Sequence, residues 1–160
     1  MTRTLIVGIG NPVRGDDGLG WHTVQHLLLA SHPADVSILA CQQLTMDLVE
    51  PVAQAERVIF IDARHGEPAG ALTCECIRPN SALSEPVSHF FDPATLLACV
   101  QALYGSHPEA VLLSISSTQF DYTETLSPPV AAALPALLEQ VQMLVAAEAS
   151  PTNGGVHAHR

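Results

Sequence analysis

The chain has few basic residues. Six Lys and Arg stand against sixteen Asp and Glu, which gives its 160 residues a formal net charge of −10. A field of this sign repels nucleic-acid phosphates and anionic lipid headgroups. We therefore expect neither nucleic acid nor a membrane surface as a partner, whereas a cation or a protein with a basic patch is compatible with this charge.

The chain also lacks a long apolar run that could serve as a membrane span. The nearest candidate, residues 128–149, contains Pro135, Glu139 and Glu148, which the core of a bilayer tolerates badly. No signal peptide is recognisable at the N-terminus, where Arg3 is followed at once by residues typical of a strand. We therefore expect a cytoplasmic protein that does not span a membrane.

Motifs for covalent catalysis are missing as well. The serines between residues 114 and 117 lack a G-x-S-x-G elbow, and Cys41 lacks any local signature of a nucleophile. The four cysteines include no C-x-x-C pair. Cys74 and Cys76 would share one face of a strand, but two thiols supply only half of a zinc site, so we expect them to be small core residues.

Short apolar runs alternate with helical patterns along most of the chain, as in domains where helices cover both faces of a parallel sheet. The expected strands are 4–8, 36–40, 58–61 and 111–115, and the expected helices are 18–30, 46–54, 93–104 and a last one that passes through Leu134 and Val145.

One connection breaks this alternation. Residues 63–68 are too few for a crossover helix, so the next run, 71–77, should be an antiparallel strand at an edge of the sheet. The pattern predicts an α/β fold, with three α/β/α layers and a mostly parallel, twisted sheet of about five strands that includes one antiparallel edge strand. We expect a single domain over 1–149 and a flexible C-terminal tail over 150–160.

A glycine-rich loop, GIGNPVRGDDGLG at residues 8–20, separates the first expected strand from the first expected helix. Its glycines look like a dinucleotide-binding turn. However, the third glycine of G-x-G-x-x-G should fall at Val13, and the carboxylates of Asp16 and Asp17 would repel a phosphate. One carboxylate could cap the following helix, while the other points outward to a cation or a polar substrate.

Two further polar residues could join this loop. Ligands of open α/β sheets bind beyond the carboxyl ends of the parallel strands, and Asp62 is expected to end the strand 58–61 at this rim. A hydrogen bond to the next loop is the alternative role for Asp62. The extended chain from residue 78 to His89 can span roughly 35 to 40 Å, which is enough to return to the same rim. Taken alone, His89 would be an ordinary loop histidine.

Taken together, these features resemble the hydrogenase maturation proteases. The likeness rests on GIGNPVRGDDGLG, on Asp62 closing a strand, on His89 after an edge strand and on a final helix led by residues 126–128, and it extends to about Glu148. The resemblance implies that the acidic loop residue of the family falls on Asp17, its strand-end aspartate on Asp62 and its histidine on His89. In the family these three residues form a metal-binding site.

The resemblance also implies an activity. Members of the family are endopeptidases that remove the C-terminal extension of a [NiFe] hydrogenase large-subunit precursor after nickel has been inserted. Asp17, Asp62 and His89 would then be the catalytic residues and would engage nickel that the precursor supplies, with no organic cofactor, while Asp16 supports the loop or caps a helix. Two carboxylates and an imidazole suit a borderline divalent metal and leave positions open for a substrate carbonyl.

The sequence departs from the family pattern at two places. The family often has Glu where this chain has Asp17, and many members carry Asp-Gly-Gly-Thr where this chain reads CQQLT at residues 41–45. A Gln-Leu-Thr version resembles the branch that serves soluble, NAD-linked hydrogenases. An alternative function from a different class is a non-catalytic nickel-binding accessory protein, or chaperone, for hydrogenase assembly.

Overall fold

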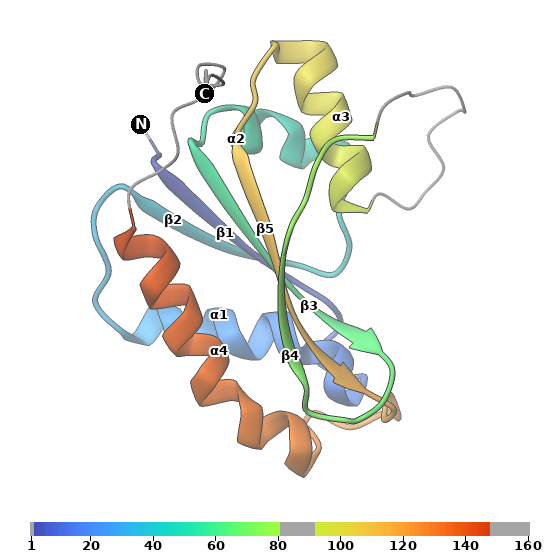
Figure 1. The fold of residues 1–160 in the computed structure, drawn as a ribbon. Helices are drawn as coiled ribbons and strands as arrows, with labels where there is room; N and C mark the ends of the chain where they lie inside the picture. The colour runs from blue at the N-terminus through green and yellow to red at the C-terminus, as the bar shows by residue number, and fades with distance from the viewer. Residues whose placement is uncertain (1, 81–91, 148–160) are drawn as a thin grey trace, which may run out of the picture.

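The computed structural model describes residues 2–80 and 92–147, and within them five strands form one sheet (Figure 1). The spatial order of the strands is β2-β1-β3-β5-β4, with β1 to β3 and β5 parallel and β4 antiparallel to β5. The strands are β1 (Thr4–Ile9), β2 (Val36–Cys41), β3 (Arg57–His65), β4 (Leu72–Cys76) and β5 (Glu109–Ser117).

Helices cover both faces of this sheet, so the expected α/β fold with three layers is confirmed. In Figure 1, α1 and α4 lie on one face and α2 and α3 on the other, and each pair encloses its own apolar core. The helices are α1 (Leu19–Leu29), α2 (Val49–Ala53), α3 (Pro93–Tyr104) and α4 (Pro128–Ala146), and short 3₁₀ turns (Gly15–Gly18 and Met46–Leu48) precede α1 and α2.

The central strand β3 shows why the apolar runs are nearly continuous. Val58 and Phe60 pack into the core under α2 and α3, whereas Ile59 and Ile61 pack into the core under α1 and α4, and all four are fully buried. Successive side chains of a strand point to opposite faces, so the next even-numbered residue, Asp62, continues on the face of Phe60. The polar end of β3 therefore begins where its apolar core ends.

The prediction that Asp62 ends its strand is wrong, because β3 continues to His65. Its pairing with β1 stops at Ile61 opposite Gly8, but its pairing with β5 continues to His65 opposite Ser117. Asp62 thus lies within β3 but beyond the end of β1. The last residues of β3 therefore have no β1 neighbour on the side where the glycine-rich loop follows β1.

The prediction that the strand after β3 is antiparallel and lies at an edge of the sheet is confirmed by β4, although β5 lies between β3 and β4. The turn crosses the end of β5, where the Gly66 and Gly70 amides donate to the Ser117 and Ser116 carbonyls at 3.0 and 2.8 Å. Gly70 has a φ of 89° and makes this reversal without the strain a side chain would bring.

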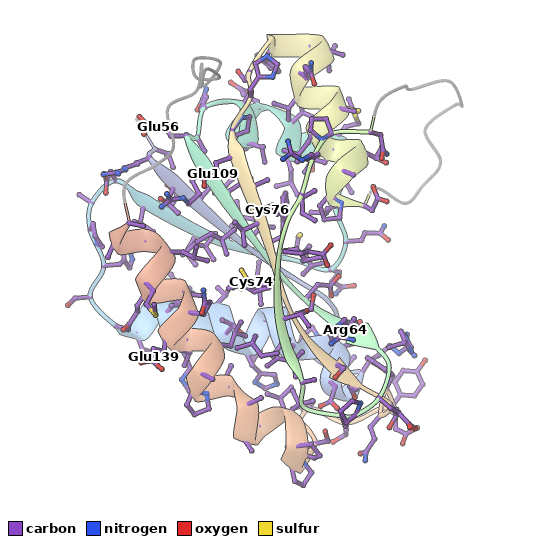
Figure 2. All side chains as sticks on the ribbon, in the orientation of Figure 1. Glu56, Arg64, Cys74, Cys76, Glu109 and Glu139 are labelled. Carbon is purple, nitrogen blue, oxygen red and sulfur yellow. The ribbon has the colours of Figure 1, made fainter. Side chains whose placement is uncertain are left out.

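The expectation that Cys74 and Cys76 are core residues is wrong. Both side chains are exposed, and Figure 2 labels their positions on β4. A strand at the edge of a sheet has a neighbour on one side only, so its side chains are covered less completely than those of β3.

One helix differs from the sequence-based expectation. The region 46–54 is a 3₁₀ turn followed by the short helix α2 rather than one continuous helix. The expected last helix through Leu134 and Val145 is confirmed as α4, which is continuous through Pro135. By length and composition α4 could cross a membrane, but its residues Val130, Leu134, Leu137 and Val141 are buried against the sheet, as in a core helix.

Candidate active site

The glycines of the loop between β1 and α1 allow two backbone segments to touch. A Cβ atom added to Gly20 would lie 2.2 Å from the Ile9 nitrogen, and one added to Gly8 would lie 2.3 Å from the Gly20 carbonyl oxygen. Gly10 has a φ of 134°, and a Cβ there would lie 1.8 Å from the Asp17 carbonyl oxygen. These glycines therefore serve close packing of the loop on β1, which places Asp17 beside the end of the strand.

Asp16 has a structural role. Its side chain is fully buried, and its carboxylate accepts hydrogen bonds from the Ser117 hydroxyl, from the Ser127 amide at 2.7 Å and from the Ser127 hydroxyl at 2.6 Å. Ser127 is the N-cap of α4, where a negative charge is favoured by the helix dipole. Of the two roles expected for Asp16, it supports the loop, here by anchoring it to the end of β5 and the start of α4, and it does not cap α1, which has no side-chain cap hydrogen bond.

Asp17 takes the outward position next to the structural aspartate. Its side chain is only partly buried, and its Oδ2 accepts a hydrogen bond from the Asn11 amide at 2.9 Å. This bond folds the carboxylate back over the end of β1 rather than out into solvent. Asp17 is thus held toward the same rim on which Asp62 lies.

Asp62 is electrostatically coupled to Asp17. Burial and, next, the negative charge of Asp17 raise the pKa of Asp62 to about 7, while a hydrogen bond from the Ala63 backbone opposes this shift. Two carboxylates that repel each other at the end of a sheet form a site that a divalent cation would stabilise. A carboxyl group with a pKa near neutrality is also suited to accept and return a proton. The topology-based prediction that Asp17 and Asp62 meet is consistent with this coupling.

Cys41 lies near Asp62, a neighbour that the sequence reading did not identify. It is the last residue of β2, and its carbonyl accepts a hydrogen bond from the Gly10 amide at 2.9 Å. Burial and the charge of Asp62 raise the pKa of the Cys41 thiol to about 11. The thiol is therefore protonated at neutral pH and is not an activated nucleophile. The sequence could have indicated this neighbour, because Cys41 directly follows the expected strand 36–40 and so lies at the carboxyl end of the sheet.

His89, the third predicted site residue, lies outside the described residues. In the part of the chain that the structure describes, no group of three or more His, Cys, Asp and Glu side chains is arranged to hold a metal ion. The nearest described segment is α3, which begins after the N-cap Asp92. In Figure 1, the start of α3 is the end of this helix nearer to the carboxyl ends of β3 and β5.

A cluster of aromatic and basic side chains connects the glycine-rich loop to the ends of β3 and β5, and it was not predicted either. The Arg14 guanidinium lies 5.8 Å from the centre of the Tyr122 ring and donates to the Phe120 carbonyl at 3.4 Å. The Phe120 ring in turn stacks on His65, with 4.1 Å between ring centres. Tyr122 is 85% exposed, so its ring faces solvent.

The fold is shared with proteins of known structure, although no protein-family model and no curated protein matches the chain. HycI, a [NiFe] hydrogenase maturation protease from Thermococcus kodakarensis, is 28% identical, with a TM-score of 0.71 over 90% of this chain and 92% of that one. A hydrogenase 2 maturation peptidase from a Thaumarchaeota archaeon is 25% identical, with a TM-score of 0.69 over 92% and 100%.

The structural neighbours of this chain are hydrogenase maturation proteases. HybD, the hydrogenase-maturating endopeptidase from E. coli, has a TM-score of 0.74 over 90% of this chain and 92% of that chain, and at 22% identity it supports the fold alone. The coverage is nearly complete in both directions, so the likeness concerns the whole described domain. Together these neighbours support a peptidase role in hydrogenase maturation.

Proposed function

We propose that this chain is an endopeptidase that removes the C-terminal extension of a [NiFe] hydrogenase large-subunit precursor after nickel insertion. The observation that carries the proposal is the coupled pair Asp17 and Asp62 at the carboxyl end of the sheet, in a fold shared with maturation peptidases. The precursor is the partner, and its nickel ion arrives as part of the substrate.

The two carboxylates have complementary tasks in this proposal. Asp17 stays close to the end of β1 through the Asn11 amide and offers its negative charge to the nickel of the precursor. A cation held by Asp17 offsets the repulsion that, together with burial, raises the pKa of Asp62 to about 7 in the free protein, so binding of the loaded precursor leaves Asp62 ionised. The ionised Asp62 takes a proton from the attacking water and returns it to the leaving amine, so processing is favoured only when the precursor carries its metal.

Three finer features belong to the same proposal. His89 completes the site with an imidazole that suits a borderline metal such as nickel. The segment at residues 41–45, with Gln-Leu-Thr in place of Asp-Gly-Gly-Thr, supports a soluble, NAD-linked hydrogenase as the source of the precursor. Processing of such a hydrogenase takes place in the cytoplasm, which is the location we propose.

Intact mass tests this function directly. The full chain is incubated with a hydrogenase large-subunit precursor, with and without nickel, and we expect loss of a C-terminal peptide in the nickel-loaded sample alone. Asp62→Asn should abolish the mass loss. Asp35→Asn, which alters an exposed aspartate just before β2, should not change it.

Two results would contradict the proposal. Undiminished processing by Asp62→Asn would remove its chemical basis. Binding of the nickel-loaded precursor with no mass change would instead favour the non-catalytic accessory role.

A further inference from the structure

Arg64 extends the face of β3 that carries Asp62. The two residues are separated by one position, so their side chains leave the strand on the same face. Arg64 pairs in register with Ser116 of β5, beyond the end of β1. Its Nη1 lies 3.4 Å from the place where a Cβ of Gly66 would stand, so the guanidinium reaches outward along the strand. Figure 2 shows Arg64 near the carboxyl end of β3.

The charge of Arg64 has no counterpart among the residues that the structure describes. No ion pair or hydrogen bond of its side chain is found there, whereas Arg57 is paired with Glu109 and Arg14 contacts Tyr122 and Phe120. Asp62 does not use this charge either, because the interaction that lowers its pKa comes from the Ala63 backbone. Among the described residues, therefore, nothing engages the Arg64 guanidinium.

A basic side chain at this rim is unusual in so acidic a chain. There is no lysine, and the six basic residues are all arginines in a protein of net charge −10. An acidic peptide would be repelled by most of the surface and attracted locally at this rim. A guanidinium presents its donors in a planar fork that matches a carboxylate, and such charge-assisted pairs are stronger than neutral hydrogen bonds.

We infer that Arg64 binds a carboxylate of the precursor segment that crosses the Asp17 and Asp62 rim. This inference rests on the proposed function, because the precursor is its ligand. A peptide lying over the two aspartates and continuing along the direction of β3 meets Arg64 next. The carboxylate is either an acidic side chain of the extension or the free carboxylate at its C-terminus.

Kinetics of precursor processing test the inference. Arg64→Gln should raise KM about tenfold or more while kcat changes little, since a charged hydrogen-bonded contact made equally in the bound and reacting states is lost. Arg64→Lys should recover part of this loss. Arg78→Gln is the matched control, because it removes the same charge from an exposed residue just after β4, and it should leave KM unchanged.

Two precursor variants identify the carboxylate. A precursor with an amidated C-terminus, or one with Gln and Asn in place of the acidic residues of its extension, should show the same raised KM with the unmodified enzyme. For the precursor variant that raises KM, Arg64→Gln should then cause no further increase in KM. If neither precursor variant changes KM, a substrate carboxylate is not the ligand and the inference is overturned.

The failure of the inference differs from the failure of the proposed function. Equal KM values for the unmodified chain and Arg64→Gln, with normal processing, overturn the role of Arg64 and leave the peptidase intact. If the unmodified chain processes nothing, the proposed function fails. In that case the affinity of the nickel-loaded precursor for the unmodified chain and for Arg64→Gln decides the role of Arg64, and equal affinities overturn it.

Discussion

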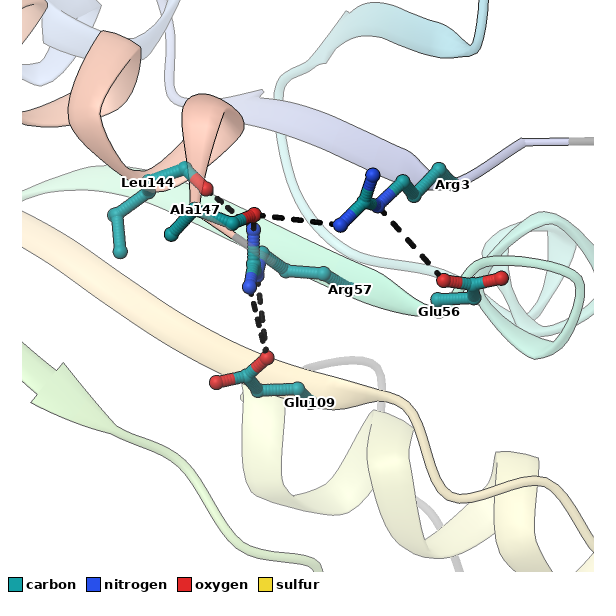
Figure 3. Close-up of polar contacts among 6 residues, drawn as sticks. All are labelled: Arg3, Glu56, Arg57, Glu109, Leu144 and Ala147. Carbon is teal, nitrogen blue, oxygen red and sulfur yellow. Dashed lines mark hydrogen bonds and ion pairs between the residues drawn. The ribbon is translucent and has the colours of Figure 1, made fainter. Parts of the chain in front are cut away.

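The two ends of the sheet hold their charges in opposite ways. At the amino end, the Arg57 side chain is only 3% exposed, and its Nη2 lies 3.2 Å from the Glu109 Oε1. The same guanidinium donates hydrogen bonds to the carbonyls of Leu144 and Ala147 at the end of α4. Every contact drawn in Figure 3 joins either two opposite charges or a hydrogen-bond donor and an acceptor.

At the carboxyl end, the charges that meet are alike. Asp17 and Asp62 are both acidic, and burial together with their mutual repulsion raises the pKa of Asp62. Compensated charges join β3, β5 and α4 into one unit, whereas the uncompensated pair destabilises the free protein. This difference indicates that the amino end stabilises the fold, whereas the carboxyl end carries a repulsion between carboxylates that a cation would relieve under the proposed function.

The largest expected effect comes from breaking the compensated end. Arg57→Gln leaves the carboxylate of Glu109 without its partner and frees the last carbonyls of α4, so we expect a loss of about 3 to 5 kcal/mol in the free energy of unfolding. Urea unfolding measures this loss. The processing activity of the folded fraction should stay unchanged, and a stability loss below about 1 kcal/mol would contradict the assigned role.

The fold was predictable to the extent that it depends on local pattern. Buried strands leave continuous apolar runs, and a six-residue connection at 63–68 allows no crossover helix, so the sheet with its antiparallel edge strand followed from the sequence. The extension of β3 to His65 did not, because it depends on pairing with β5 more than fifty positions away. The exposure of Cys74 and Cys76 likewise depends on which strand lies at the edge.

The next effect concerns the uncompensated end and has the opposite sign. Folding raises the pKa of Asp62 from 3.8 to about 7, so between these pH values the folded state keeps a proton that the unfolded chain releases. Stability therefore falls as the pH rises through this window. Asp62→Asn should raise the free energy of unfolding by about 2 to 4 kcal/mol at pH 8 while abolishing processing.

The pH dependence of the free energy of unfolding tests the stability gain expected for Asp62→Asn. Urea unfolding at several pH values should show the advantage of Asp62→Asn shrink as the pH falls and vanish below about pH 4, where both states are protonated. Asp35→Asn, at an exposed position, should show no such trend. A constant difference across this range would mean that the aspartate is not destabilised by its surroundings.

The neighbouring residues Asp16 and Asp17 repeat the comparison on a smaller scale. Asp16→Ala removes the acceptor of the Ser127 amide and hydroxyl, so we expect a loss of about 2 to 3 kcal/mol in the free energy of unfolding. Asp17→Ala loses one bond from the Asn11 amide and should cost about 1 kcal/mol, but it should abolish processing. Parallel urea unfolding and mass assays separate the two residues, and equal stability losses would contradict this assignment.

Composition and spacing alone could not assign these two roles, which were expected only from the resemblance to the maturation proteases. Asp16 and Asp17 are chemically identical neighbours, and the partners that distinguish them, Ser117 and Ser127, lie 101 and 111 positions from Asp16. Topology was enough to bring Asp17 and Asp62 to one rim, because parallel strands end at the same edge of a sheet. Arg64 escaped notice since its strand was expected to end before it.

The smallest expected effect separates burial from pairing at the amino end. The Arg3 Nε lies 3.9 Å from the Glu56 Oε1, and both side chains are substantially exposed (Figure 3). Arg3→Gln should therefore lower the free energy of unfolding by less than about 1 kcal/mol, and added salt should reduce the difference further. Arg57→Gln at the same end should keep most of its effect in salt, because the Arg57 side chain is only 3% exposed and is shielded from ions. If salt reduced the stability losses of Arg3→Gln and Arg57→Gln equally, both pairs at the amino end would behave as exposed ion pairs. The two ends of the sheet would then differ in the exposure of their charges and not in the sign of those charges.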